Sequence, residues 1–188
     1  RLKLQALAPP WSPPDVAATA LPAPSARRFF AQSAFRAVTL VREQGLPLAV
    51  RPGARVLLAG QFEEFIAEGR RRFPGADAVL FPFNPFYTAR PEDLRSIPAQ
   101  GASYDLVLFC LANYNSLEIL QALRPLAPRV AVVSALSPVY LRDTPWVRTA
   151  VAVYGSGRDS FRAGFAALLG DFRPTGRLPV DFAGLAGP

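Results

Sequence analysis

The sequence contains no histidine and a single cysteine, Cys110. Without histidine, the chain cannot assemble a Ser-His-Asp triad or offer an imidazole to a zinc ion. Cys110 lies in the apolar run 106–112, where a thiol usually behaves as a small buried hydrophobe. It has no histidine to activate it and no second cysteine to pair with. These absences exclude the commonest nucleophilic and zinc-dependent chemistries.

Long apolar runs are also missing. The longest, 106–112 and 130–136, have fewer than ten residues, whereas a helix that crosses a bilayer needs about 20. We therefore expect a soluble chain without a membrane partner. No signal peptide is visible and the sequence has no methionine, so we expect a piece of a longer polypeptide whose compartment stays unknown.

Lysine is represented by Lys3 alone, so the formal charge of +7 comes from arginine. Clustered cations can bind nucleic acid by releasing counterions from phosphates. The densest cluster, 70–72, falls at the end of a predicted helix, where cations complement the helix dipole. No aromatic RNA-binding motif or helix-turn-helix spacing accompanies it. We expect no nucleic-acid partner.

Proline and small residues dominate positions 1–25 and predict an extended interdomain arm. The remaining residues, 26–188, are long and apolar enough to form one domain with its own core. The first predicted helix of this domain is 26–36, with Ser25 as its N-cap.

Short apolar runs then alternate with amphipathic segments. The predicted strands are 37–41, 55–60, 77–81, 106–112, 129–134 and 149–154, and the helices between them include 116–123 and a last helix that begins at Asp159 or Ser160. Continuously apolar strands are buried on both faces, and their alternation with helices predicts a parallel sheet. We predict the α/β class: a three-layer α/β/α sandwich with five or six mostly parallel strands.

Ligands of open α/β sheets bind beyond the carboxyl ends of the strands. Aromatic and amide side chains in two of these segments are the candidate cleft or interface residues: Asn84, Phe86, Tyr87, Asn113, Tyr114 and Asn115. Such side chains suit sugar stacking and hydroxyl recognition, although surface loops commonly contain them. The other strand-end segments are 61–64, 134–137 and 155–158.

The last of these segments, Gly155-Ser156-Gly157, has the placement of a dinucleotide loop. The third glycine of that loop is missing, and no acidic ribose ligand can follow because this is the last strand. A plain glycine-rich turn before a helix is the simpler interpretation, so we expect no bound nucleotide.

No pair of carboxylates suits acid/base catalysis. Glu63 and Glu64 are neighbours on one predicted helix, whereas a glycosidase needs two carboxylates that face each other across roughly 5–9 Å. Glu118 and Asp171 are isolated. We therefore assign no catalytic, metal-binding or cofactor-binding residue to this chain.

The end of the chain, an apolar helix followed by Pro174-Thr175-Gly176-Arg177-Leu178-Pro179-Val180, resembles the closing signature of the C-terminal domain of glycoside hydrolase family 3. Leu46-Pro47-Leu48 and Ala152-Val153-Tyr154-Gly155 are similar to earlier motifs of that domain. The resemblance implies a flavodoxin-like sandwich that follows a catalytic barrel through the arm 1–25, with the barrel absent here.

Within this family, β-glucosidases carry their acid/base glutamate in a long insertion after the third strand, which residues 113–115 are too few to provide. The short connection is more similar to bacterial β-N-acetylhexosaminidases, whose catalytic residues lie on the barrel. The resemblance implies a retaining parent enzyme that removes terminal N-acetylglucosamine without a cofactor, and a fragment that is inactive alone. The alternative is a stand-alone carbohydrate-binding or scaffold module.

Structural roles are implied for the closing signature, which includes Gly176, Arg177, Leu178 and Pro179. We expect Gly176 and Pro179 to shape the last turn and Arg177 to make an ion pair. The partners implied are the N-terminal barrel of the same chain and, indirectly, a carbohydrate substrate.

Overall fold

A computed structural model of the protein describes residues 24–83, 88–179 and 181. Six strands, five helices and two 3-10 helices occur in this described part, in the order α3 (Pro24–Ala37), β1 (Thr39–Glu43), β2 (Val56–Gly60), α4 (Glu63–Arg72), β3 (Asp77–Leu80), α5 (Pro91–Gly101), β4 (Leu106–Leu111), α6 (Tyr114–Ala122), η1 (Arg124–Arg129), β5 (Val130–Ser134), η2 (Pro138–Asp143), β6 (Thr149–Ala152) and α7 (Arg158–Leu169). From β2 onward, strands and helices alternate. None of the described helices is long and apolar enough to cross a membrane.

The strands form one sheet in the order β1-β6-β5-β4-β2-β3. Neighbours from β3 to β6 are parallel, and β1 is antiparallel to β6 at one edge. The predicted, mostly parallel sheet is confirmed. Counted from β2, the parallel strands follow the flavodoxin-like order 2-1-3-4-5.

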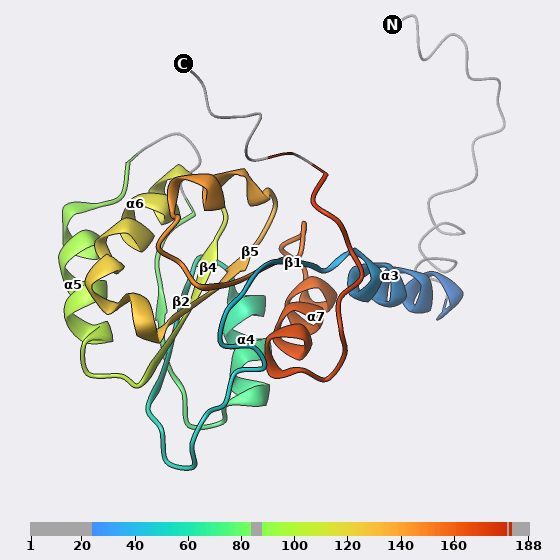
Figure 1. Ribbon diagram of the computed structural model, residues 1–188, viewed down its shortest axis with the longest axis horizontal. Helices are drawn as coiled ribbons and strands as arrows, with labels where there is room; N and C mark the ends of the chain where they lie inside the picture. Colours follow the sequence, from blue (N-terminus) through green and yellow to red (C-terminus); the bar gives the residue numbers. More distant parts are fainter. Residues whose placement is uncertain (1–23, 84–87, 180, 182–188) are drawn as a thin grey trace, which may run out of the picture.

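Helices cover both faces of the sheet and give three layers (Figure 1). On one face α4 and α7 pack together, and α3 packs on α7; on the other, α5 packs on α6. Each face has its own core, one centred on Phe65, Phe161 and Phe165 and the other on Phe109 and Ile97. The predicted three-layer α/β/α sandwich is therefore confirmed.

Burial explains why the strands could be recognised. All residues of β2, β5 and β6 are buried, because helices cover them on both sides. The edge strands β1 and β3 are partly exposed. Beside the sheet, the Phe65 ring stacks on Phe165 with centroids 5.2 Å apart and meets Phe161 edge to face at 5.5 Å.

Several element boundaries differ from the prediction. Helix α3 begins at Pro24 and not at residue 26, because proline suits the first turn of a helix, so Ser25 lies inside the helix. Strand β1 runs two residues later than expected, and α7 begins at Arg158 with Gly157 as N-cap. Residues 1–23 of the predicted arm lie outside the described residues.

Candidate functional site

The carboxyl ends of β2 and β4 form the topological switch point of the sheet. These two strands are neighbours, but the chain leaves β2 into α4 on one face and leaves β4 into α6 on the other. Open α/β sheets bind their ligands at such a point. The side chains that follow β2 and β4 are therefore the first to consider.

Two amide side chains and one carbonyl are joined at this point. The Gln61 Nε2 group donates to Asn115 Oδ1 at 2.8 Å and to the carbonyl of Pro82 at 3.1 Å. The Asn115 Nδ2 group donates to the same carbonyl at 3.1 Å. This amide cluster thus connects the ends of β2 and β3 to the first turn of α6.

Asn113 holds α6 in place as its N-cap. Its side chain accepts from the backbone N–H of Ser116 at 3.2 Å, and Ser116 Oγ accepts from the backbone N–H of Asn113 at 3.0 Å. This capping box explains why the helix begins at Tyr114, two residues before the predicted start.

Gln61 in the amide cluster and the neighbouring Asn113 have unused hydrogen-bonding capacity. Gln61, Asn113 and Asn115 are each at least nine-tenths buried, with exposures of 7%, 5% and 5%. Within the described part of the chain, Gln61 Oε1 and Asn113 Nδ2 are buried without a hydrogen-bond partner. Buried groups of this kind are rare in native proteins and require an explanation, such as an ordered water molecule or a bound group. The site therefore offers one unused hydrogen-bond acceptor and one unused donor to a bound group.

Large apolar side chains are exposed at the same edge of the sheet. Tyr114 is 52% exposed, Phe83 44% and Leu136 42%. The Phe83 ring also contacts Phe62, with centroids 5.5 Å apart. The structure therefore places the predicted Asn113, Tyr114 and Asn115 together, while the predicted Asn84, Phe86 and Tyr87 lie outside the described residues.

Backbone strain marks the ends of β5 and β6. Leu136 and Tyr154 have φ angles of +58° and +57°, the left-handed region that side chains with a Cβ rarely adopt. Such conformations cost of order 1–3 kcal/mol and are common at functional sites. Tyr154 is held there by its hydroxyl, which donates to Thr39 Oγ1 at 2.9 Å.

The described carboxylates that the sequence analysis considered form no acid/base pair. Glu63 and Glu64 are neighbours on one helix, as predicted, and both are exposed in the first turn of α4. Glu118 accepts from the backbone N–H of Ala89 at 2.6 Å, and Asp171 pairs with Arg72. The searched residues contain no group of three or more His, Cys, Asp or Glu that could hold a metal. Since amides neither gain nor lose protons near neutral pH, the cluster at the switch point can bind but cannot act as a general acid.

Cys110 lies in the core beneath this edge. Burial raises the pKa of its thiol well above its usual range, and a backbone hydrogen bond from Gln61 opposes that shift. The side chain is fully buried. The prediction of a buried thiol is confirmed.

The closing signature is explained at Gly176. Its backbone N–H donates to the carbonyl of Val38 at 3.1 Å, and a Cβ here would lie 2.5 Å from that oxygen and 2.6 Å from the carbonyl of Ala37. Only glycine allows the chain to come this close to the end of α3. Arg177 is exposed without an ion pair to any described residue, so its predicted ion pair stays a prediction. Leu178 and Pro179 follow in irregular backbone.

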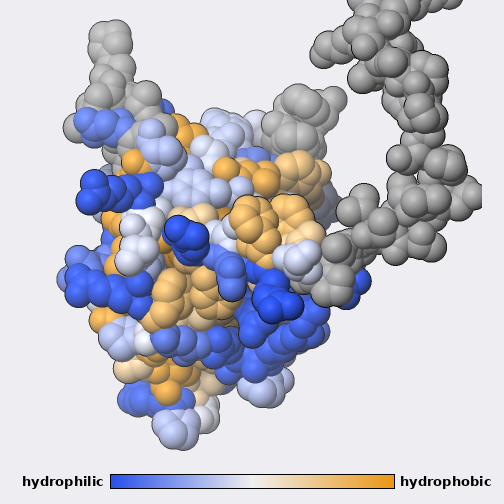
Figure 2. All heavy atoms as spheres, turned by 90° about the vertical axis from the view of Figure 1, so that its right-hand side faces the viewer, coloured by the Kyte–Doolittle hydropathy of each residue, from blue (hydrophilic) through white to orange (hydrophobic). Residues whose placement is uncertain are grey.

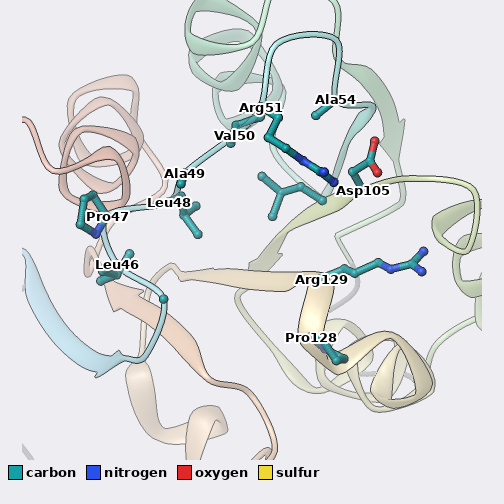
Figure 3. A pocket seen from close by; sticks show the side chains of 12 residues that line it. Leu46, Pro47, Leu48, Ala49, Val50, Arg51, Ala54, Asp105, Pro128 and Arg129 are labelled. Carbon is teal, nitrogen blue, oxygen red and sulfur yellow. The ribbon is translucent and has the colours of Figure 1, made fainter.

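A separate hollow of about 470 Å³ lies at the opposite, amino-terminal edge of the sheet. The segment 45–51 forms one wall, and the residues that precede β4 and β5 form the other. Figure 3 shows the Arg51 side chain extending toward Asp105. The Arg129 side chain points away from the wall that contains Leu46, Pro47 and Leu48. Its charged side chains are exposed. We therefore place the candidate site at the carboxyl edge.

Two polar residues of the structure are absent from the predicted site. Gln61 lies in the strand-end segment 61–64, and its position directly after a buried strand is a signal in the sequence. Glu68 gave no signal; its side chain is 5% exposed and accepts from Arg158 at 2.9 Å, which joins α4 to α7.

No known family model and no curated protein matches the sequence. Solved structures do match. A family 3 β-N-acetylglucosaminidase from Paenibacillus sp. str. FPU-7 matches with a TM-score of 0.73 and 17% identity over 94% of this chain and 35% of that one. A β-glucoside phosphorylase matches with a TM-score of 0.64 and 22% identity, over 98% of this chain and 36% of that one.

A fungal multi-domain family 3 β-N-acetylglucosaminidase matches with a TM-score of 0.66 and 20% identity, over 80% of this chain and 18% of that one. The chain thus spans about a fifth to a third of the length of these proteins. At such identities the likeness concerns the fold. The chain has the fold of one part of the solved glycoside hydrolase family 3 enzymes, which confirms the fold that the resemblance of the sequence implies.

Proposed function

We propose that this chain is the non-catalytic C-terminal domain of a retaining glycoside hydrolase, and that its catalytic barrel precedes it in a longer polypeptide. The coverage carries this proposal, because 80–98% of the chain matches a minor part of each of several glycoside hydrolase family 3 enzymes. The chemistry of the carboxyl edge supports it. The described residues there offer amides and aromatic rings, and the carboxylates of Glu63 and Glu64 are exposed neighbours in the first turn of α4.

The proposed parent enzyme is a β-N-acetylhexosaminidase that removes terminal N-acetylglucosamine. The connection between β4 and α6 consists of Ala112 and Asn113, which leaves no room for the inserted acid/base loop of the β-glucosidase subgroup. Two of the structural neighbours are β-N-acetylglucosaminidases by name. In this proposal, both catalytic groups belong to the barrel.

The carboxyl edge of the sheet would form one wall of the substrate cleft. Asn113, Tyr114 and Asn115 already lie together at this edge, and Asn84, Phe86 and Tyr87 are proposed to extend the same wall. Phe81 does not contribute to this wall, because it is 2% exposed and stacks on Phe109 in the core. Phe83, which is 44% exposed, is proposed to contribute an aromatic ring instead.

The test is to express the longer chain that includes the upstream coding region and to assay it with 4-nitrophenyl glycosides. We expect β-N-acetylglucosaminide hydrolysis with retention of configuration, with kcat/KM exceeding that for β-glucoside or β-xyloside by about tenfold or more. A preference for glucoside or xyloside would refute the substrate assignment. No turnover of any glycoside would refute the proposed function.

One observation favours the alternative, a stand-alone carbohydrate-binding module. The exposed rings of Tyr114 and Phe83 lie at the same edge as buried amides with unused capacity, a combination that suits sugar stacking. Calorimetric titration with N-acetylglucosamine and chitobiose distinguishes the two functions. Millimolar or tighter binding by this chain, lost in Tyr114→Ala, would favour the module.

A further inference from the structure

A second surface lies on the α3 side of the molecule. Here a groove of about 410 Å³ separates α3 from the turn between β6 and α7. Figure 2, which views the molecule from this side, shows apolar surface among strongly hydrophilic side chains. Phe30, Ala34 and Ala37 form one wall of the groove, and Val153, Tyr154 and Gly155 form the other. Both walls are predominantly apolar.

The helical wall exposes an unusual run of residues. Arg27, Arg28, Phe29 and Phe30 are four successive exposed residues, and Phe29 and Phe30 are 64% and 63% exposed. Exposed pairs of phenylalanine are uncommon on a soluble surface unless another surface covers them. By helical spacing, Arg27 lies one turn before Phe30 on the face that lines the groove.

No described residue compensates the charge at this end of α3. Arg27 and Arg28 lie near the positive end of the helix dipole, and the first turn of α3 contains no acidic residue. Neither arginine makes an ion pair with a described residue. Across the groove, Asp159 lies in the first turn of α7, where it complements the N-terminus of its own helix. The α3 wall therefore fits an acidic partner.

The opposite wall is held in a fixed shape. Tyr154 has the left-handed φ described above, and its hydroxyl is bound to Thr39 at the start of β1. Thr39 Oγ1 donates in turn to the carbonyl of Ala37, the last residue of α3, at 3.1 Å. These hydrogen bonds connect both walls, so the groove is preorganised. Binding of a partner therefore carries no further free-energy cost for ordering the groove.

We propose that this groove, with Arg27 and Phe30 at its rim, is where the preceding domain of the parent chain docks, through an apolar side chain flanked by acidic residues. The inference rests on the proposed function. That function places a further domain upstream of α3, and in the matched structures about two thirds or more of each polypeptide lies outside the matched part. Because Arg27 and Arg28 are positively charged, we expect the contact surface of that domain to be acidic.

Hydrogen–deuterium exchange of residues 153–160 tests the groove in the longer chain and in the present 188-residue chain. We expect these amides to exchange more slowly in the longer chain by about tenfold or more. Arg27→Glu and Phe30→Glu should remove that protection. Gln32→Glu is the matched control, since it introduces the same side chain at an exposed position of the same helix.

Arg27→Glu also separates docking from folding. An acidic residue near the N-terminus of α3 should leave the 188-residue chain as stable as before or more stable, because it complements the helix dipole. The same substitution should speed the hydrogen–deuterium exchange of residues 153–160 in the longer chain. Equal exchange in the two wild-type chains, or equal effects of Arg27→Glu and Gln32→Glu, would overturn the proposal.

The outcomes distinguish this inference from the proposed function. An active longer chain with an unprotected groove would refute the docking site and leave the function standing. An inactive longer chain with a protected groove would refute the glycosidase function alone. A source gene that encodes no domain upstream would refute both.

Discussion

Gln61 donates a 2.8 Å hydrogen bond to Asn115, and this contact joins the end of β2 to the first turn of α6 across the switch point of the sheet. Both residues are at least nine-tenths buried. The same Gln61 amide group also donates to the carbonyl of Pro82. One side chain therefore fixes three segments that converge at the candidate site.

Replacing Gln61 should destabilise the fold as a whole. Gln61→Ala leaves Asn115 Oδ1 without its donor and takes one of two donors from the Pro82 carbonyl, so we expect a loss of about 1–3 kcal/mol in the free energy of unfolding. Urea denaturation measures this change in the free energy of unfolding. The control Gln121→Ala, at an exposed position of α6, should change stability by less than about 0.5 kcal/mol. Equal effects would contradict the structural role of Gln61.

Gly176→Ala should destabilise the chain through a backbone clash. The new Cβ would lie within 2.6 Å of the carbonyl oxygens of Ala37 and Val38, and backbone atoms cannot rotate away. We expect a cost of about 1–3 kcal/mol in thermal or urea unfolding. Gly75→Ala is the matched control, because a Cβ there meets no atom within 4 Å. If both variants unfold alike, the close approach at Gly176 is wrong.

The ion pair between Arg158 and Glu68 should couple α7 to α4. Arg158→Gln removes the 2.9 Å hydrogen bond to the buried Glu68 carboxylate, and we expect a loss of about 1–2 kcal/mol because the arginine is itself largely exposed. Substituting Arg71, which lies 3.5 Å from the same carboxylate, should reduce the free energy of unfolding by less.

A double-mutant cycle isolates this contact. In a Glu68→Gln background, Arg158→Gln should have little further effect on the urea midpoint. An undiminished effect in that background would show that Arg158 stabilises the fold through something other than Glu68.

Cys110 should make stability depend on alkaline pH. Burial raises the pKa of the thiol in the folded state, so the unfolded chain loses its proton first, from about pH 8.5 upward. Because the unfolded state then binds fewer protons, stability falls as pH rises, by up to about 1.4 kcal/mol per pH unit. Below pH 8 this contribution should be constant.

The measurement compares wild type with Cys110→Ala in urea between pH 7 and pH 10. Cys110→Ala should be less stable at pH 7 because it leaves a cavity. The difference between the two proteins should shrink above pH 8.5. A constant difference up to pH 10 would contradict the burial of an un-ionised thiol.

Much of the fold could be predicted because its signals are local. The runs 106–112 and 130–133 are continuously apolar, and β4 and β5 occupy them because helices cover both faces of the sheet. Asn113 precedes α6 with a serine three residues later, which is a capping signal in the sequence itself. The start of α3 differed from the prediction because the proline-rich composition masked the suitability of Pro24 for a first turn.

The polar contacts could not be predicted, because their partners are distant in sequence. Gln61 and Asn115 are 54 positions apart, and Glu68 and Arg158 are 90 apart. Arg42 likewise donates to the carbonyls of Leu141 and Val147, at 2.8 and 3.1 Å, about a hundred positions away. Composition and periodicity describe one segment at a time, so they do not show which distant side chains meet.

The central claim is that the catalytic groups of the parent enzyme lie outside this chain. The most direct test is to assay the purified 188-residue chain with 4-nitrophenyl β-N-acetylglucosaminide beside the longer chain at equal molarity. We predict no turnover above background by the short chain and ordinary enzymatic turnover by the longer one. Comparable turnover by the short chain, abolished by substituting one of its own side chains, would contradict the account.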